Sequence, residues 1–195
     1  MAVPPEHWRL SEFSLQGHFL LSMPQLNGSY FGQSLILMCE HNADGALGII
    51  VNKSTKVPLT DMLDELEIPS PQPLIAQELK VLEGGPVAQD RGFVLHSHTL
   101  EESDCLQLAP ALYLSGATAA LSELVNAQTK GEFLVMLGYA GWGAGQLEEE
   151  IKDNAWLTVE ASSEVVFASV NDTKLERAAA QLGIDYRLLA DAGHA

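Results

Sequence analysis

Four glycines within eight residues, in the run Gly138-Tyr-Ala-Gly-Trp-Gly-Ala-Gly145, constrain this chain more than any other feature. Core packing does not require such a run, because glycine has no side chain to pack and weakens strands and helices alike. Glycine instead permits sharp turns and the close approach of another backbone. The run follows the apolar segment Phe133–Leu137 and leads into Gln146–Asp153, so we expect a strand, a glycine-rich loop and a helix in that order.

This order also occurs in phosphate-binding motifs, but the spacing here differs from theirs. The dinucleotide motif G-x-G-x-x-G needs a glycine at the position of Gln146, and the Walker motif needs a Gly-Lys-Ser/Thr that this chain lacks. Glu148, Glu149 and Glu150 occupy the first helical turn, where they complement the helix dipole and would repel a phosphate. The pattern disfavours a bound nucleotide, and we predict no cofactor.

Two interpretations of the glycine-rich loop remain open. In the structural one, the glycines turn the chain sharply and Trp142 partly covers the core. In the other, the loop forms one wall of the main groove, because Trp142 offers a flat apolar face with one N–H donor and Gln146 both donates and accepts hydrogen bonds. The candidate residues for binding a ligand or partner are then Gly141, Trp142, Gly143, Gln146 and Glu149.

Short apolar runs separated by turn residues predict about eight strands. A β-hairpin is expected where Ser34–Cys39 and Ala46–Val51 flank His41-Asn-Ala-Asp-Gly45, whose Asn, Asp and Gly residues tolerate left-handed backbone. The other predicted strands are Phe19–Met23, Lys80–Glu83, Gly92–His96, Cys105–Leu108, Ala111–Leu114, Phe133–Leu137 and Trp156–Val159. The strands cluster early in the chain and do not alternate regularly with helices.

Helical patterns predict four helices, and Thr60 is expected to cap the first of them. The predicted helices are Thr60–Leu66, Thr118–Gln128, Gln146–Asp153 and Asp172–Leu182, with Gly183 as a left-handed stop after the last. Together with the strands, they predict an α+β fold with a mixed, partly closed, barrel-like β-sheet and about four flanking helices.

The length of 195 residues suits a single domain spanning residues 1–195. Within it we expect an N-terminal extension over residues 1–16 and a proline-rich surface loop over residues 68–76. The N-terminus lacks the pattern of a signal peptide, and the longest apolar runs are far below the roughly 20 residues that a membrane helix needs. We therefore expect a cytoplasmic protein without membrane association.

The net charge of the chain limits the kinds of partner that it can bind. The chain has 10 Lys and Arg residues against 26 Asp and Glu residues, which gives a formal net charge of −16. Such a chain repels nucleic acid phosphates and anionic membranes, and its basic residues are scattered along the sequence. Direct binding to DNA is therefore disfavoured.

The histidines and cysteines are candidate metal ligands, but their spacing does not favour a metal site. His96-Ser-His98 places two imidazoles on one face of a strand, and Cys39-Glu-His41 places a thiol and an imidazole on one face in the same way. Neither the two cysteines, Cys39 and Cys105, nor the histidines have the spacing of a zinc site, so we predict no metal. Buried free thiols are the expected state of both cysteines.

Several segments together resemble the YqgE/AlgH family of bacterial proteins. They are Gly17–Pro24, Gly45–Asn52, Gly84–Val87, Arg91–His96, Gly138–Ile151, Asn154–Trp156 and Leu182–Asp185. The resemblance implies a compact α+β domain of no established biochemical activity. It also implies a connection with transcriptional regulation of alginate production, as some members are described.

Two functional hypotheses from different classes follow. The first is a regulatory protein that affects transcription indirectly, through a protein partner or a small ligand. The alternative is a hydrolase-like or nucleotide-handling enzyme that uses the Gly138–Ile151 loop and combines Glu148 or Glu149 with His96. The two differ in whether these side chains converge in one pocket.

Overall fold

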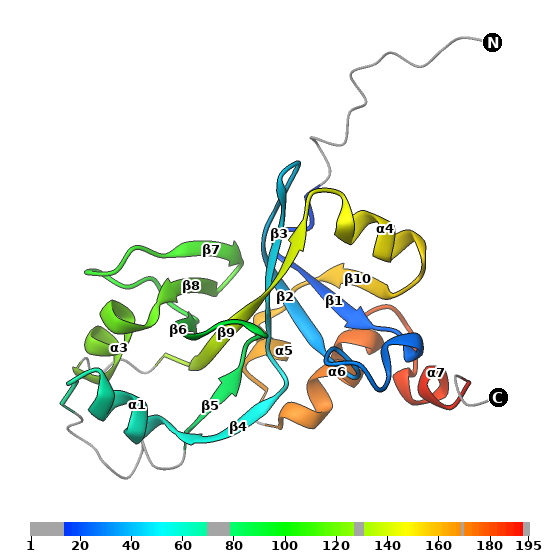
Figure 1. Cartoon of the computed structure of the whole chain (residues 1–195). Coiled ribbons are helices and arrows are strands. Elements are labelled where there is room, and N and C mark those ends of the chain that lie inside the picture. The colour runs from blue at the N-terminus through cyan, green and yellow to red at the C-terminus, as the bar shows by residue number, and fades with distance from the viewer. Residues whose placement is uncertain (1–13, 70–78, 127–130, 169, 193–195) are drawn as a thin grey trace.

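The computed structural model describes residues 14–69, 79–126, 131–168 and 170–192. These residues fold into a ten-stranded sheet with six α-helices (Figure 1). The strands are β1 His18–Ser22, β2 Leu35–Asn42, β3 Gly45–Ile50, β4 Ser54–Pro58, β5 Lys80–Glu83, β6 Val87–His96, β7 Leu106–Ala109, β8 Leu112–Gly116, β9 Phe133–Gly143 and β10 Trp156–Glu160. The helices are α1 Leu59–Glu65, α3 Ala117–Asn126, α4 Gln146–Lys152, α5 Ser163–Val166, α6 Asn171–Ala180 and α7 Tyr186–Ala192, and a 3₁₀ turn, η2, spans Pro24–Leu26. Among the described residues, no helix is long and apolar enough to cross a membrane.

Strand β9 belongs to both halves of the sheet. Its first part pairs antiparallel with β6, from His96 opposite Phe133 to Val87 opposite Tyr139, and in parallel with β5. Its last four residues pair instead with β3, from Gly48 opposite Ala140 to Gly45 opposite Gly143. In Figure 1, β9 runs from the half that contains β5 to β8 into the half that contains β1 and β10.

A glycine allows β9 to change partners. Gly138 has a φ of +77°, which is unfavourable for any residue with a Cβ atom. A Cβ atom there would lie 2.3 Å from the carbonyl oxygen of Gly85, so the close approach of that backbone also requires glycine. The backbone amide of Gly84 donates to the carbonyl of Leu137 beside this point. The glycine-rich signature therefore begins inside a strand, and the expectation of a loop from Gly138 onward is wrong up to Gly143.

The sheet is curled but not closed. Its strands follow the order β10-β1-β2-β3-β9-β6-β8-β7, with β10 and β7 at the two ends. The carbonyl oxygen of Leu108 in β7 lies close to Gly17, where a Cβ atom would be only 2.2 Å away. No backbone pairing joins β7 to β1 or β10 among the described strands, so the partly closed, barrel-like sheet expected from the sequence is not confirmed.

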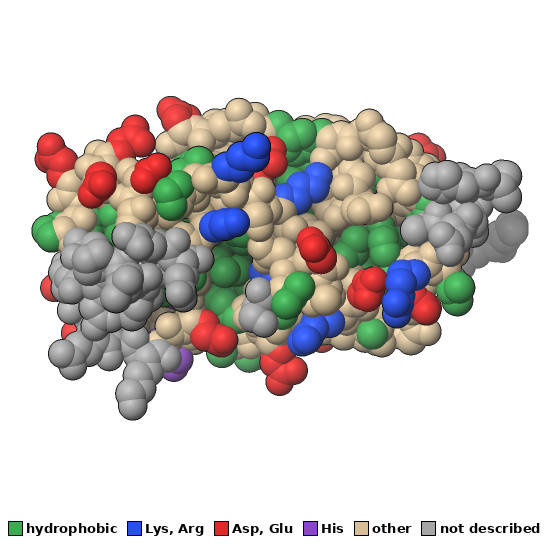
Figure 2. All heavy atoms as spheres, turned by 90° about the horizontal axis from the view of Figure 1, so that it is seen from below, with side chains coloured by type: hydrophobic (Ala, Val, Ile, Leu, Met, Phe, Trp, Pro, Cys, Tyr) green, Lys and Arg blue, Asp and Glu red, His purple; other side chains and the backbone are tan. Residues whose placement is uncertain are grey.

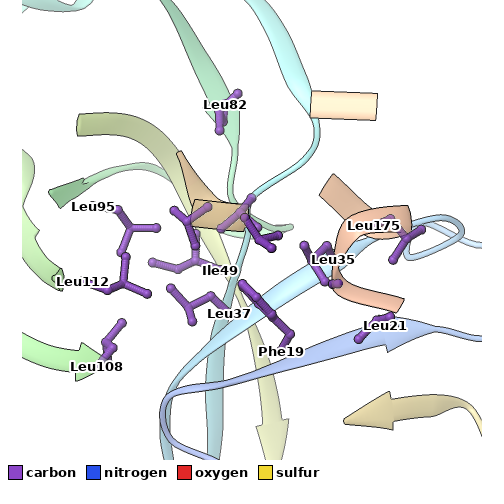
Figure 3. Close-up of a cluster of buried hydrophobic side chains, with 14 of the residues drawn as sticks. Phe19, Leu21, Leu35, Leu37, Ile49, Leu82, Leu95, Leu108, Leu112 and Leu175 are labelled. Carbon is purple, nitrogen blue, oxygen red and sulfur yellow. The ribbon is translucent and has the colours of Figure 1, made fainter. Parts of the chain in front are cut away.

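The largest hydrophobic core lies inside this curl, and two smaller clusters lie on the other faces. In Figure 3, Phe19 and Leu37 from β1 and β2 meet Leu95, Leu108 and Leu112 from β6, β7 and β8. Helices α1 and α3 cover a second cluster on β6 and β9. A third cluster gathers residues of β1, β2 and β3 under α4 and contains both Trp142 and Trp156.

The predicted strands are all present, and β4 is an additional one. The prediction of about four helices is wrong, because the described residues contain six. The sequence did not reveal α5, which has four residues, or α7, which has seven. The expected cap at Thr60 is also wrong, since α1 begins at Leu59 after Pro58 and has no side-chain cap. Gly183 adopts the predicted left-handed conformation with a φ of +71°.

Parts of three predicted segments lie outside the described residues. These parts are residues 1–13 of the N-terminal extension, residues 70–76 of the proline-rich loop, and residues 127–128 at the end of the helix predicted from Thr118.

Helix α6 buries a lysine completely. Lys174 is 0% exposed, and its Nζ atom donates to the carbonyl oxygen of Val51 at 3.0 Å. Burial lowers the pKa of its ammonium group from 10.5 to about 8, because a charge is poorly solvated there. Among the described residues, Lys174 forms no ion pair.

We expect the burial of Lys174 to make the free energy of unfolding depend on pH. Between pH 8 and 10.5 the unfolded chain binds more protons at Lys174 than the folded one, so stability rises with pH over that window. Relative to Lys174→Met, the wild-type protein should gain up to about 3 kcal/mol between these two pH values. Urea denaturation of both proteins at several pH values measures the difference. A constant difference across the window would contradict the prediction.

Candidate functional site

The end of β9 and the start of α4 form a compact turn over the third core cluster. β9 ends at Gly143, Ala144 and Gly145 make the turn, and α4 begins at Gln146. Gly145 has a φ of +74°, and the side chain of Gln146 accepts a hydrogen bond from the amide of Gly143 at 3.0 Å. We call residues 141–149 the signature surface.

The carboxylate of Glu150 holds this turn together through hydrogen bonds to three side chains. Its Oε2 atom accepts hydrogen bonds from the indole N–H groups of Trp142 at 2.9 Å and Trp156 at 2.8 Å. Its Oε1 atom accepts one from the Nε2 of Gln146 at 2.9 Å. One carboxylate thus satisfies both buried indole donors and fixes Gln146, which in turn holds Gly143. Hydrogen bonds to a charged acceptor are stronger than neutral ones, so this network makes the turn rigid.

The two indoles are packed as well as bonded. Trp142 is 7% exposed, and the ring of Phe31 stacks on it with centroids 6.4 Å apart. Trp156 is 3% exposed and meets Trp142 edge-on at 6.2 Å. This arrangement leaves little of the Trp142 ring for a ligand.

The five predicted binding residues therefore divide into two groups. Gly141, Gly143, Gln146 and Glu149 are exposed residues of the signature surface. Trp142 is a core residue beneath that surface, so its flat face is not offered to solvent in this conformation. A role in binding stays a prediction for all five, and for Trp142 it would be an indirect one.

A second polar contact joins the signature to β2. The backbone amide of Leu15 donates to Nδ1 of His41 at 3.0 Å, so the ring proton is on Nε2, which donates to Oε1 of Glu148 at 3.0 Å. Burial raises the pKa of the Glu148 carboxyl, but hydrogen bonds from its own amide and from His41 outweigh it, so the pKa lies below its usual value. His41 thus ties the start of the described chain to α4.

A β-bulge decides where His41 points. The pairing of β2 with β3 shifts between Met38 and Glu40. Cys39 consequently packs in the large core, while His41 reaches Leu15 and Glu148 on the opposite face. The prediction that Cys39 and His41 share a face is wrong for this reason. Burial also raises the pKa of the Cys39 thiol, so it is a poor nucleophile.

The other histidine pair is built into the opposite half of the sheet. Nδ1 of His96 lies 2.5 Å from the carbonyl oxygen of His98, and Nε2 lies 3.0 Å from the hydroxyl of Ser115. Burial lowers the pKa of His96, which favours the neutral ring. The side chain of His98 is exposed and lies 2.8 Å from the hydroxyl of Ser97. Within the described residues, no three His, Cys, Asp or Glu side chains could hold a metal ion together.

The proposed enzyme pair is not brought together. His96 lies opposite Phe133 at the start of β9, whereas Glu148 lies beyond the far end of that strand. The intervening length of strand is roughly 30 Å at about 3.3 Å per residue. Glu148 pairs with His41 instead of His96.

Comparison with known proteins places the chain in a family. A family model described as AlgH-like matches residues 19–187. The chain belongs to the AlgH-like family. A UPF0301 protein of Shewanella sp. (strain W3-18-1) is 40% identical over 185 residues, covering 93% of this chain and 99% of that protein. A UPF0301 protein of Stutzerimonas stutzeri is 43% identical over 182 residues, covering 93% and 96%.

Solved structures of two proteins share the fold of this AlgH-like chain. The solution structure of the AlgH protein from Pseudomonas aeruginosa is 37% identical, with a TM-score of 0.76 over 93% of this chain and 95% of that one. A crystal structure of a Corynebacterium diphtheriae protein is 20% identical, with a TM-score of 0.67 over 94% and 95%. The second likeness concerns the fold alone.

Sequence reasoning missed Glu150 as the centre of the site. From the sequence, Glu148, Glu149 and Glu150 are expected only to complement the helix dipole and to repel a phosphate. Two buried tryptophans do signal a need for acceptors, since indole N–H groups seek partners when buried. The spacing of Trp142, Glu150 and Trp156 does not show that one carboxylate serves both.

Replacing this carboxylate should destabilise the fold. In Glu150→Gln, an amide cannot accept all three hydrogen bonds, so we expect a loss of about 2 kcal/mol and a melting temperature lower by roughly 4–8 °C. The matched control is Glu149→Gln on the same helix, where the side chain is 69% exposed and pairs only with Lys152. Calorimetry of both variants tests the difference, and equal melting temperatures would refute the role of Glu150.

Truncating Trp142 tests whether the residue supports the surface or recognises a partner directly. Because the ring is buried, Trp142→Ala should cost about 3–5 kcal/mol of stability. Trp142→Phe keeps an aromatic ring in the cluster and loses the N–H donor and part of the ring volume, so it should cost less than Trp142→Ala. Urea unfolding measures both. If Trp142→Ala keeps nearly wild-type stability, the ring is not the structural support described here.

Proposed function

We propose that this AlgH-like protein is a non-enzymatic regulatory protein of the cytoplasm that affects transcription indirectly, through a partner bound at the signature surface. The observation that supports this proposal most is the Glu150 network. Its three hydrogen bonds hold in place a turn whose exposed glycines, Gly141, Gly143 and Gly145, leave the backbone uncovered by side chains. Pre-organised surfaces of this kind lower the entropy lost on binding.

The charge around the signature surface suggests the chemistry of the partner. Glu149 is exposed on α4, and Asp44 is exposed beside Gly45, which pairs with Gly143. Acidic side chains therefore flank the exposed backbone on two sides. A protein segment with Lys or Arg side chains and free backbone carbonyls or amides would complement it.

Direct DNA binding is not favoured by the helices either. Helices α6 and α7 follow one another through a short turn that contains Gly183, which is the connectivity of a helix-turn-helix. The sequence of α7, Tyr-Arg-Leu-Leu-Ala-Asp-Ala, holds one arginine and one aspartate and therefore no excess of positive charge. Recognition helices instead meet phosphates with clustered basic residues.

The alternative enzyme has no supporting constellation among the described residues. Glu148 lies on α4 beyond one end of β9 and His96 lies at the other end of that strand, and the thiol of Cys39 is buried in the core. These positions therefore do not support the hydrolase-like or nucleotide-handling function.

A steric block at the signature surface tests the proposal. A Cβ atom at Gly143 would have only the Gln146 Oε1 atom near it, at 3.9 Å, so Gly143→Lys should fold normally while covering the exposed backbone. In its host bacterium lacking the native gene, Gly143→Lys should fail to restore the transcript profile that the wild-type protein restores. RNA sequencing of the complemented strains provides the measurement.

Gly116→Lys is the matched control, because a Cβ atom at Gly116 meets nothing within 4 Å and its backbone is not left-handed. It adds the same side chain to the other half of the sheet and should restore the profile. Full restoration by Gly143→Lys would contradict the proposal. So would submicromolar, competitor-resistant binding of the purified protein to a defined DNA duplex.

A further inference from the structure

Strand β10 lies at one end of the sheet and pairs with a single neighbour, β1. Backbone hydrogen bonds at both ends of this pair fix its phase. The amide of Met23 donates to the carbonyl of Ala155 at 2.9 Å, and the amide of Ala161 donates to the carbonyl of Gly17 at 2.9 Å. In an antiparallel pair, hydrogen-bonded positions alternate with positions that are not bonded. The bonds to β1 therefore come from the odd-numbered residues of this segment.

The backbone groups of Trp156, Thr158 and Glu160 consequently point away from β1. Within the described residues, their amides and carbonyls have no hydrogen-bond partner. Trp156 is buried under α4, but Thr158 is partly exposed and Glu160 is exposed. In Figure 1, β10 leads away from the end of α4 beside β1. Its outer edge is thus a row of free donors and acceptors, which is the template that another strand needs.

Two other edge strands carry features that natural proteins use against unwanted pairing. β7, at the opposite end of the sheet, has a register shift, and its Leu108 carbonyl lies against Gly17. β4 also has a register shift, and it contains Lys56 and Pro58. Bulges, prolines and lysines all hinder pairing at an edge. β10 contains no lysine or proline, and it pairs with β1 without a register shift.

Acidic side chains flank the outer edge of β10. Asp153 precedes the strand, Glu160 ends it and Glu164 follows it, and all three are exposed. Between Asp153 and Glu164 the chain has no lysine or arginine. Lys152, which comes directly before this segment, forms an ion pair with Glu149. The edge therefore combines free backbone groups with negative charge.

This charge favours a basic partner over a second copy of the chain. Figure 2 shows Lys and Arg side chains over the middle of the lower face, where α6 and β4 lie, and not along β10 in the sequence. A second copy that paired through β10 would bring the same acidic edge and a further formal charge of −16. A strand with basic side chains would instead be attracted.

The two faces of β10 specify the side-chain pattern of an added strand. Leu157 and Val159 pack against the large core on one face. Because side chains alternate along a strand, Thr158 and Glu160 lie on the opposite face. Side chains of neighbouring strands interact on the same face of a sheet. An added strand should therefore alternate, with apolar side chains beside Leu157 and Val159 and basic ones beside Glu160.

We propose that the outer edge of β10 binds an extended segment of a partner protein, with alternating apolar and basic side chains, as an additional strand of the sheet. Backbone hydrogen bonds to Thr158 and Glu160 hold the segment, and the Glu160 carboxylate selects its basic side chains. The edge lies outside the signature surface. A block at Gly143 and a block at Thr158 therefore test different contacts, and either can fail without the other.

Hydrogen exchange of the free, full-length protein tests the phase of the edge. The amides of Leu157 and Val159 bond to β1, so they should exchange at least about tenfold more slowly than those of Thr158 and Glu160. NMR spectra of the ¹⁵N-labelled protein in D₂O measure the rates. Equal or slower exchange at Thr158 and Glu160 would overturn the proposal.

The binding test titrates the same ¹⁵N-labelled protein with the peptide Lys-Val-Lys-Val-Lys-Val-Lys, acetylated and amidated at its ends. The matched peptide has Glu in place of each Lys. At constant ionic strength, the basic peptide should give saturable shifts of the Thr158 and Glu160 amides, because these donors gain acceptors from the added strand. The acidic peptide should give none.

A proline in β10 tests whether the backbone makes the contact. Thr158→Pro removes an outward N–H and breaks no bond to β1, a position where an edge strand tolerates proline. It should weaken binding of the basic peptide at least about tenfold, because the added strand loses a donor and meets the proline ring. Thr158→Val is the matched control, since it keeps the N–H and the shape of the side chain, and it should bind like the wild-type protein.

A charge reversal tests the selection of basic side chains and remains informative if Thr158→Pro does not fold. Glu160→Lys keeps the backbone groups and should weaken binding of the basic peptide at least about tenfold. The matched control is Glu65→Lys, which makes the same change at an exposed residue of α1 and should leave the affinity nearly unchanged.

Four binding results would overturn the proposal. The first is the absence of saturable shifts with the basic peptide, and the second is saturable binding whose shifted amides lie away from β10. The third is equal affinity of Thr158→Pro and Thr158→Val, or of Glu160→Lys and Glu65→Lys, which would leave the edge or its charge without a role. The fourth is a wild-type dimer in sedimentation that Thr158→Pro dissociates, which would assign the edge to a second copy of the chain.

Discussion

The close approach of two backbones at Gly138 is the constraint on which the rest of the structure depends. A single strand, β9, pairs with β5 and β6 up to Tyr139 and with β3 from Ala140 onward. That exchange of partners needs a left-handed φ and room for the Gly85 carbonyl, and only glycine supplies both. Because β9 is continuous, the core under α1 and α3 and the core under α4 are organised by one strand. A side chain at this position would therefore disturb both cores.

The second organising element is a carboxylate among aromatic rings. A partly buried carboxylate loses hydration that hydrogen-bond donors must replace, and Glu150 accepts three hydrogen bonds. The same three bonds orient Trp142, Trp156 and Gln146. This explains how a stretch with four glycines, which would otherwise be pliable, is held in one conformation. The glycines leave the backbone uncovered by side chains, and the hydrogen bonds of Glu150 fix its conformation.

The sequence predicted the strands well and the geometry of the site poorly, for physical reasons. The apolar parts of the predicted strands Ser34–Cys39 and Phe133–Leu137 face the core on both sides of the sheet and are bounded by turn residues, so local pattern reveals them. The short helices α5 and α7 depend on tertiary contacts, since isolated helices of that length are not stable. The candidate residues Gly141, Gly143, Gln146 and Glu149 are exposed, and they belong to β9 and α4, which adjoin in sequence. The burial of Trp142 and the pairing of His41 with Glu148 depend on contacts between distant segments, which spacing does not encode.

Because of the β-bulge in β2, the faces to which its side chains point depend on the number of residues in the strand. The amino-acid composition does not show this dependence. Up to Met38 the side chains alternate between the large core and the cluster under α4, and after the bulge the phase is inverted. His41 meets Leu15 and Glu148 only because one extra residue has been inserted before it. Loss of that residue would leave every neighbouring amino acid unchanged and yet turn the imidazole into the apolar interior. In this strand, insertions and deletions are therefore more damaging than most substitutions, and homologous chains should conserve its length more strictly than its composition.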